Sequence, residues 1–508
     1  MTKKNSPIKK YLPSLSTKYA IYSLLFIFII LRIIYLFSPI IGAQSWRQAD
    51  TAAMARNFFE NGYNILYPQI DWGGNSPGFV ESEFPIYQYV IALLYKIFGL
   101  HEFIGRLISI FFSIISIYLL YKIVLKLIDQ KTALWSTFIY SILPLNIFYS
   151  RVFMPEPLLI LSILAGIYFF ILWIESQRLL YFSLSLVFIT TACLIKIPTL
   201  YIGLPLAFLA FKKYGWKAII KPPLLFFSGF ILISLYLWYS HAHQIFIDTG
   251  LSFGIWGYGS DKWGNWDFIF TWEYFNGVFF KNIAEKHLTW IGFIFFLIGL
   301  IKFYKHKEYR FFYSWIAAAL IYLIIVAKGN YFHDYYQLPI TIPFAVFIGS
   351  AFTKYFDSST LNIYKKTLLY VSLALLFLLS GARLVDYFGR EDLSKNDKYH
   401  LALKSNELVE TNSLVIAVSS YDPMLLYNAH KKGWQCFPSE LTEEFILEKK
   451  NLGAKYILGN KSEFKTNELN RFLSNGFKFI YEDSASFIIS LHTSQSFPLK
   501  IIQNLKNR

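Results

Sequence analysis

Long apolar runs are the feature that most constrains this chain. About 20 consecutive apolar residues cross the hydrocarbon core of a bilayer as a helix. The composition agrees, because 55% of the residues are hydrophobic and only 16% are charged, which excludes an ordinary soluble domain. We expect an α-helical, multi-pass membrane protein. About eleven runs of near-spanning length are predicted to be helices: 17–39, 106–127, 132–149, 157–175, 178–195, 198–211, 222–240, 288–304, 311–327, 337–354 and 367–386.

The basic residues indicate which side of the membrane each loop faces. The formal net charge of +16 would suggest nucleic-acid binding in a soluble chain, but here the lysines lie in short segments between apolar runs. Such loops face the cytoplasm in membrane proteins. We therefore expect membrane lipids around the chain and no nucleic acid as a partner. The N-terminal segment, with Lys3, Lys4, Lys9 and Lys10, is expected to be cytoplasmic.

The segment 84–99 decides the topology. It is apolar enough to count as another crossing, but a crossing there would move every later basic cluster to the outer side. We therefore interpret it as an interfacial helix, with Tyr87, Tyr89 and Tyr95 at the level of the lipid headgroups. Nearly all candidate chemistry then lies on the outer side. The outer segments are 40–105, 150–157, the turn at Lys196, 241–287, 328–337 and everything after about 388.

The last part of the chain differs in character from the rest. Residues 389–508 are more polar, and short strand-like runs alternate there with helical stretches, which is typical of a small α/β domain. We expect it to follow a transmembrane domain at 1–388 and to serve substrate docking or stability. The predicted strands are 414–418, 455–458, 477–481 and 486–491, and the predicted helices are 440–450 and 465–473.

Asp50 is the first candidate for catalysis. It lies in the sequence Trp46-Arg-Gln-Ala-Asp50-Thr51, directly after the first apolar run. A carboxylate at the mouth of a membrane span is costly to keep there and indicates a function. The alternative is a helix N-cap, because Asp50 precedes a good helix-forming segment that includes Arg56.

Acids and histidines offer a possible metal site. Glu81 and Glu83 flank one serine just before the interfacial helix, and they suit either a divalent cation or sugar hydroxyls. The alternative is a pair of acids favoured by the start of a helix. His241 and His243 border an aromatic loop and are candidate metal ligands together with Glu83.

Basic and tyrosine side chains suit a phosphate group at the membrane surface. Arg151 and Glu156 lie between two apolar runs, where a simple ion pair is the alternative interpretation. Lys196 is a lone cation on the outer side, and snorkelling of its side chain is the alternative to a phosphate contact. Dense hydrogen-bond donors follow in one later segment: Lys328, His333, Tyr335 and Tyr336.

These elements, taken in order, resemble the GT-C glycosyltransferases. The resemblance covers roughly residues 17–355 and rests on Asp50, Glu83-Phe-Pro, Ser150-Arg-Val-Phe-Met-Pro-Glu156-Pro, Lys196-Ile-Pro and His333-Asp-Tyr335-Tyr336. Within the superfamily the chain is most similar to bacterial relatives of protein O-mannosyltransferases and to the aminoarabinose transferase of lipid A.

The resemblance implies a fold, a reaction and roles. It implies a GT-C bundle with interfacial helices in the first outer loop, set in the inner membrane of a bacterium. It also implies transfer of one sugar, with inversion, from a polyprenyl-phosphate donor to a hydroxyl of a glycan, lipid or protein. Asp50 matches the catalytic aspartate and Glu83 an acid of a divalent metal site. Glu156 matches the acid of the second outer loop, whereas Thr51 stands where the commonest pattern has a second acid.

The residues fit such a reaction independently of the resemblance. A base must take the proton of the acceptor hydroxyl, and cations must stabilise the leaving phosphate. Asp50 suits the first role. The candidates for contacts with the phosphate or the substrate are Arg56, Arg151, Glu156, Lys196, Lys328, His333, Tyr335 and Tyr336.

Two other classes remain open at this point. A transporter or flippase for a lipid-linked sugar would carry ionisable residues near the middle of its spans, often in two repeated halves. An outer-face glycan polymerase or ligase would use a similar donor but would join preassembled chains. The apolar runs are nearly free of charge and show no repeat, which favours a surface active site.

Overall fold

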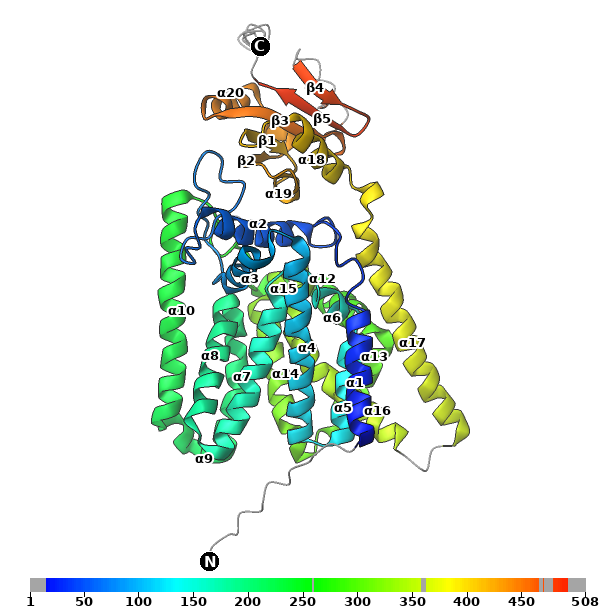
Figure 1. The fold of residues 1–508 in the computed structure, drawn as a ribbon. Coiled ribbons are helices and arrows are strands. Elements are labelled where there is room, and N and C mark those ends of the chain that lie inside the picture. The colour runs from blue at the N-terminus through cyan, green and yellow to red at the C-terminus, as the bar shows by residue number, and fades with distance from the viewer. Residues whose placement is uncertain (1–14, 258–259, 358–361, 466–468, 470–477, 492–508) are drawn as a thin grey trace, which may run out of the picture.

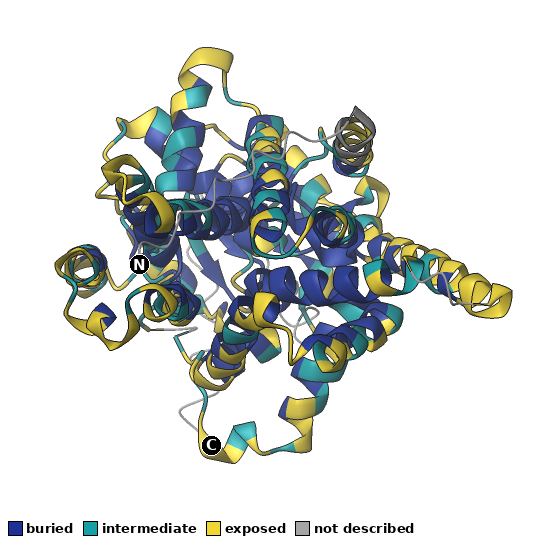
Figure 2. Cartoon of the chain, turned by 90° about the horizontal axis from the view of Figure 1, so that it is seen from below, coloured by how far each residue is buried: buried dark blue, intermediate teal, exposed yellow. Residues whose placement is uncertain are grey.

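The computed structural model describes residues 15–257, 260–357, 362–465, 469 and 478–491. A bundle of long helices carries a smaller unit with a β-sheet at one end, which we call the domain end (Figure 1). The N-terminal lysines at positions 3–10 lie outside the described residues. Buried residues fill the centre of the bundle, and exposed residues lie mostly around it (Figure 2). The chain is a multi-pass membrane protein.

Every predicted run overlaps a helix of the bundle, although several of these helices are short. Within the described residues, six helices are long and apolar enough to cross a bilayer, or seven if one sharply bent pair counts as a span. The count of about eleven crossings therefore stays a prediction. The matching helices are α1 (Leu15–Ile30), α4 (Glu102–Leu127), α5 (Gln130–Ile142), α7 (Glu156–Ser176), α8 (Leu179–Ile195), α9 (Gly203–Tyr214), α10 (Pro222–Thr249), α13 (Thr289–Phe303), α14 (Arg310–Ile325), α16 (Thr341–Phe356) and α17 (Ile363–Phe388).

Two breaks explain why the first helices are shorter than predicted. Helix α5 ends at Ile142 because Leu143 precedes a proline and adopts an extended conformation, and the short α6 (Pro144–Tyr149) restarts with that proline. Helix α1 ends at Ile30, and just after this end the buried side chain of Arg32 lies inside the bundle. The Arg32 guanidinium donates to Ser150 Oγ at 2.6 Å and to the Ser141 carbonyl at 3.0 Å.

Arg106 of α4 binds the irregular segment after α1. Its guanidinium donates to the carbonyls of Tyr35 at 2.8 Å, Leu36 at 3.1 Å and Pro39 at 3.2 Å, and also to that of Ser38. These carbonyls have left the helix, so the buried cation replaces their lost partners. Both buried arginines of these first spans therefore serve the backbone.

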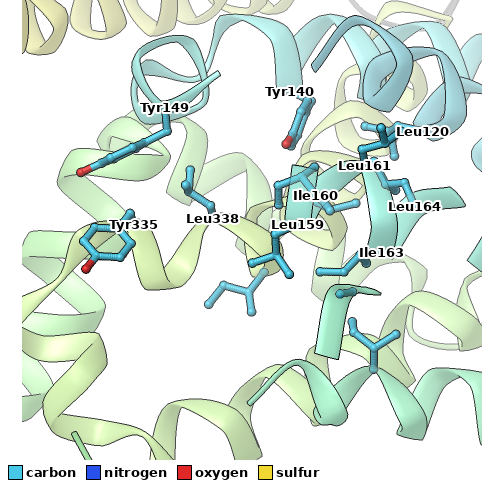
Figure 3. Close-up of a cluster of buried hydrophobic side chains, with 14 of the residues drawn as sticks. Leu120, Tyr140, Tyr149, Leu159, Ile160, Leu161, Ile163, Leu164, Tyr335 and Leu338 are labelled. Atoms are coloured by element: carbon cyan, nitrogen blue, oxygen red, sulfur yellow. The ribbon is translucent and has the colours of Figure 1, made fainter. Parts of the chain in front are cut away.

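Tightly packed aliphatic side chains form the centre of the bundle. Leu120 of α4 lies beside Leu161 and Leu164 of α7, as Figure 3 shows, and all three are buried. By contrast, α10 and α17 expose most of their apolar side chains, as lipid-facing helices do. The remaining elements of the bundle are α11 (Trp266–Ile269), α12 (Trp272–Phe275), α15 (Ala327–Phe332) and the helical turns Ile197–Ile202, Gly215–Ile220, Asn276–His287, Lys307–Tyr309, Asp334–Ile340 and Gly389–Glu391.

Helices α2 (Ser45–Asn61) and α3 (Ile86–Phe98) lie across the domain end (Figure 1). Helix α3 is about 20 Å long at 1.5 Å per residue, too short to cross a bilayer. The helix lies across the end of the bundle as predicted, whereas the level of its tyrosines relative to the headgroups stays a prediction. Tyr87 and Tyr95 are buried in the bundle, and Tyr87 Oη donates to the Gly105 carbonyl at 3.0 Å.

The C-terminal domain is a five-stranded sheet with helices, as predicted. The strand order is β2-β1-β3-β5-β4; β1 is parallel to β2 and β3, whereas β5 is antiparallel to β3 and β4. Strand β2 is missing from the prediction, and the helix predicted at 465–473 lies largely outside the described residues. The elements are α18 (Asp397–Leu408), β1 (Leu414–Val418), α19 (Met424–Asn428), β2 (Gly433–Cys436), α20 (Glu443–Asn451), β3 (Ala454–Asn460), β4 (Lys478–Glu482), β5 (Ser486–Ser490) and the turns Leu393–Lys395, Pro438–Glu440 and Lys461–Glu463.

Candidate active site

A small cleft of about 70 Å³ opens at the domain end of the bundle. Segments that are far apart in the sequence line it: the end of the first loop, the turn after α8, the loop after α10 and the segment before α16. Three of the predicted residues contribute, Glu83, Lys196 and Tyr336. The other lining residues are Ile197, Pro198, Tyr239, Gly254, Ile255, Ser260, Lys262, Trp263 and Val326.

Asp50 lies inside α2, one turn after its start at Ser45. The N-cap alternative is therefore wrong, because Gln44 occupies that position. The Asp50 carboxyl is buried, and Oδ1 accepts a hydrogen bond of 3.0 Å from Trp72 Nε1. Burial raises the pKa of Asp50 to about 8, and the nearby Asp71 adds to this rise. Such a carboxyl is a stronger base than an ordinary aspartate.

Arg47, which the sequence analysis did not single out, connects α2 to the cleft. Its Nη2 lies 2.8 and 2.9 Å from the two carboxylate oxygens of Glu83, and its guanidinium stacks on the Phe253 ring at 4.3 Å. Burial opposes ionisation of Glu83, but Arg47 holds the pKa of this carboxyl below its usual range. The charged pair fixes the orientation of α2 relative to the cleft.

Lys196 projects into the cleft beside two tyrosine rings. Its Nζ lies 3.9 Å from the centre of the Tyr336 ring and 4.8 Å from that of Tyr335. The same Nζ is 3.4 Å from Glu156 Oε1, while Glu156 Oε2 has no hydrogen-bond partner among the described residues. Burial lowers the pKa of Lys196. Lys196, Glu156, Tyr335 and Tyr336 thus come together, as predicted.

Lys262 is a second cleft residue that the sequence analysis missed. Burial, together with Arg47 and Lys196, lowers its pKa to about 8, although Glu83 opposes this effect. Burial and the three cations at Lys262, Lys196 and Arg47 also lower the pKa of His333 to about 4, so its imidazole is neutral at pH 7. The only sequence signal for Lys262 was its place in an outer loop rich in aromatic residues.

Glu81 holds that loop over the cleft. Its Oε2 accepts hydrogen bonds from Ser252 Oγ at 2.6 Å and from the backbone N–H groups of Phe253 at 3.1 Å and Ile255 at 3.3 Å. The Trp256 N–H is a fourth donor to this oxygen, at 3.5 Å, so Glu81 fixes the path of the chain from Ser252 to Trp256. The side chain of Glu81 therefore has a structural place here.

A family model and several solved structures are similar to this chain. Residues 82–240 match the family described as dolichyl-phosphate-mannose-protein mannosyltransferase. No curated protein matches the sequence. ArnT from Cupriavidus metallidurans bound to undecaprenyl phosphate superimposes with a TM-score of 0.67 at 12% identity, over 94% of this chain and 98% of that chain. The chain has the GT-C fold.

Two archaeal structures extend the likeness to other GT-C proteins. The oligosaccharyltransferase of Archaeoglobus fulgidus in the apo form has a TM-score of 0.59 at 13% identity, over 97% of this chain and 76% of that chain. The oligosaccharyltransferase AglB of the same organism, in complex with an inhibitory peptide and a dolichol-phosphate, has a TM-score of 0.56 at 13% identity, over 88% and 70%. These likenesses establish the fold.

Three predicted phosphate contacts have other partners in this GT-C chain. Arg56 is bound to Asp71, Arg151 to Glu391, and Lys328 to Asp261. The first two pairs are buried. Arg56–Asp71 joins α2 to a later part of the first outer loop, and Arg151–Glu391 joins the segment before α7 to the turn after α17. The predicted alternative for Arg151, a pair with Glu156, is wrong because Glu391 takes this role.

The structure does not bring Glu83, His241 and His243 together as metal ligands. Both Glu83 oxygens face Arg47, His241 Nε2 lies 2.8 Å from the Leu66 carbonyl oxygen, and His243 packs on Trp256 at 4.7 Å. No group of three acidic, histidine or cysteine side chains suits a metal ion in the part of the chain that the structure describes. A GT-C structure from A. fulgidus contains Zn and sulfate, but the residues present here do not fit such a site.

Proposed function

We propose that this protein is a glycosyltransferase of the outer face of a bacterial plasma membrane. It moves one sugar from a polyprenyl-phosphate donor to an acceptor hydroxyl. The observation that carries the proposal is the placement of Asp50, a buried carboxyl with a raised pKa, on the same helix as Arg47. Arg47 binds Glu83 of the cleft and lies close enough to Lys196 and Lys262 to lower the pKa of both lysines. Arg47 is thus within electrostatic reach of both the base and the two lysines.

The reaction follows from these roles. Asp50 accepts the proton of the acceptor hydroxyl as its oxygen bonds to the anomeric carbon, and the bond from that carbon to the phosphate oxygen breaks. The leaving phosphate takes the bonding electrons. Lys196 and Lys262 stabilise its charge, and the hydroxyl of Tyr336 and the neutral imidazole of His333 are further donors. Attack opposite the phosphate inverts the anomeric centre.

An apolar cavity supports a lipid carrier as the donor. It measures about 320 Å³ and lies among α7, α8, α9 and α10. Its lining includes Thr199, in the turn that follows Lys196, and continues along α9 to Phe211 and on to α10. A phosphate at Lys196 would therefore leave the isoprenoid chain beside this cavity. ArnT and AglB, which share the fold, have been solved with undecaprenyl phosphate and dolichol-phosphate.

The basic clusters support the orientation. Lys126 ends α4 and Lys131 begins α5, whereas Lys212 ends α9 and Lys217 lies in the turn before α10. These ends of the helices lie opposite the C-terminal domain (Figure 1). This end faces the cytoplasm by the positive-inside rule. The cleft and the C-terminal domain then face the outside.

Mass spectrometry of surface glycans and lipid-linked sugars tests the proposal. A deletion strain is complemented with the native gene, with Asp50→Asn, or with the exposed control Asp248→Asn, at equal expression. We expect the deletion to remove one sugar residue, and the native gene and the control, but not Asp50→Asn, to restore it. Restoration by Asp50→Asn would overturn the role of Asp50. Loss of a whole chain instead of one sugar would indicate a polymerase or ligase.

A further inference from the structure

The first outer loop is attached to the free edge of the C-terminal sheet. Strand β2 is an outermost strand, and its first residue, Gly433, bonds to the loop in both directions. The Gly433 N–H donates to the Asp71 carbonyl at 3.0 Å, and the Gly74 N–H donates to the Gly433 carbonyl at 2.8 Å. The segment from Asp71 to Gly74 thus lies on β2 much as a short neighbouring strand would.

Trp72 lies in the middle of this attached segment. Its ring packs against the core of the C-terminal domain, which includes Leu425 and Leu426, and also against a small cluster under the loop that includes Met54 and Val80. The indole is therefore held from both sides. Its Nε1–H is the donor that reaches Asp50 Oδ1 at 3.0 Å.

Further contacts fix the same segment to α2. Arg56 Nη2 binds Asp71 Oδ2, and Arg56 Nη1 donates to the Tyr427 carbonyl of α19 at 3.1 Å. The Asn57 side chain donates to Asp71 Oδ1 at 3.1 Å. Helix α2, the loop and the C-terminal domain are thus joined next to Asp50.

We propose that Trp72 is a positioning residue for Asp50, and that the C-terminal domain keeps Trp72 in place through the edge of β2. The indole N–H holds the carboxylate in one orientation, with its second oxygen left for the acceptor. This inference rests on the proposed function, since the base is the group being positioned. It gives the C-terminal domain a role inside the active site instead of a role at a distance.

The ionisation of Asp50 provides a test that needs no substrate. The carbonyl stretch of a protonated carboxyl is followed by infrared spectroscopy against pH in the full-length protein, and the band that Asp50→Asn lacks is assigned to Asp50. The indole N–H favours the charged carboxylate, so its loss raises the pKa. We expect Trp72→Phe, which keeps an aromatic ring, to move the midpoint upwards by about half a pH unit or more. An unchanged midpoint overturns the role of Trp72.

A glycine variant tests the part played by the domain. Gly74 has φ +66°, and a Cβ there would lie 2.3 Å from the Trp434 ring, so Gly74→Val separates the loop from β2 without touching Asp50. We expect it to move the midpoint in the same direction as Trp72→Phe. Gly229→Val is the matched control, because a Cβ at Gly229 meets nothing within 4 Å. A shift in Trp72→Phe but not in Gly74→Val overturns the role of the domain.

Activity in the same preparations separates this inference from the proposed function. With a working sugar transfer, we expect Trp72→Phe to lower kcat with little change in KM and to move the acidic limb of its pH profile to higher pH. Trp216→Phe, an exposed tryptophan at the opposite end of the bundle, should leave both unchanged. If the native protein transfers no sugar, the proposed function fails, and the infrared midpoints still decide the place of Trp72.

Discussion

The two arginines of α2 have the same side chain and opposite surroundings. Arg47 is bound to Glu83 and lies near the cations of the cleft, whereas Arg56 is bound to Asp71 and to the C-terminal domain. Asp50 lies between them on the same helix. The comparison teaches that one helix carries both the proposed base and a joint to the C-terminal domain, and that the surroundings of each arginine depend on the element it faces. The following predictions test how far the two regions are separate.

Of the two arginines, we expect Arg47→Ala to cause the larger loss of activity. The change removes a cation near the proposed phosphate position and leaves Glu83 as an unpaired, buried carboxylate. We predict a fall in kcat/KM of roughly 100-fold or more. Sugar transfer by purified protein in lipid vesicles is the measurement. A loss below about tenfold would show that the Arg47–Glu83 pair is only structural.

The pH dependence of kcat and of stability should report on Asp50, because its carboxyl titrates near neutral pH whereas both arginines stay charged. The base must be charged, so we expect kcat to fall about tenfold per pH unit as the pH is lowered below about 8. The folded pKa of Asp50 lies above its ordinary value of 3.8, so the free energy of unfolding falls as pH rises between these two values.

Asp50→Asn should lack this pH-dependent loss of stability. Chemical denaturation of the two proteins at several pH values is the measurement. We expect Asp50→Asn to gain stability relative to the native protein as the pH rises through this window. Parallel pH dependences in the two proteins would contradict the raised pKa.

Arg56→Ala should act mainly on stability. Removing one partner of a buried pair leaves Asp71 charged and unpaired, at a cost of about 3 kcal/mol or more. We expect a lower unfolding temperature and faster proteolytic cutting near residue 390, with a smaller loss of activity in the folded fraction than for Arg47→Ala. Equal losses of activity in the two variants would mean that the cleft and the joint form one functional unit.

The smallest effect is expected from Lys328→Ala. Its ion pair with Asp261 is partly exposed, and such pairs contribute less than about 1 kcal/mol. We predict activity within about twofold of the native protein in the same transfer assay. A large loss would place Lys328 in contact with the substrate and extend the cleft towards α15.

The sequence predicts the bundle well because hydrophobicity is a local property. Asp50, Lys196 and Tyr336 were recognisable because polar side chains beside apolar runs are rare and costly. Arg47 and Lys262 were missed because their roles depend on which way α2 faces and on how the loop after Ser252 folds. No spacing in the sequence indicates either.

Pairings across long separations were out of reach for the same reason. Arg151 lies 240 positions before its partner Glu391, and Asp71 approaches Gly433 only because the C-terminal sheet is seated on the first loop. Local patterns cannot specify such contacts. The roles of Arg56 and Arg151 followed from the fold alone.

The carbonyls bound by Arg106 also bear on the order of assembly during synthesis. Helix α1 leaves the ribosome before α4, and until α4 arrives, the carbonyls of Leu36 and Pro39 lack the Arg106 guanidinium as a partner and need water or lipid headgroups instead. The end of α1 is therefore held near the membrane surface during this interval. When α4 inserts, Arg106 binds these carbonyls in place of water, so we expect α1 and α4 to enter the bundle together.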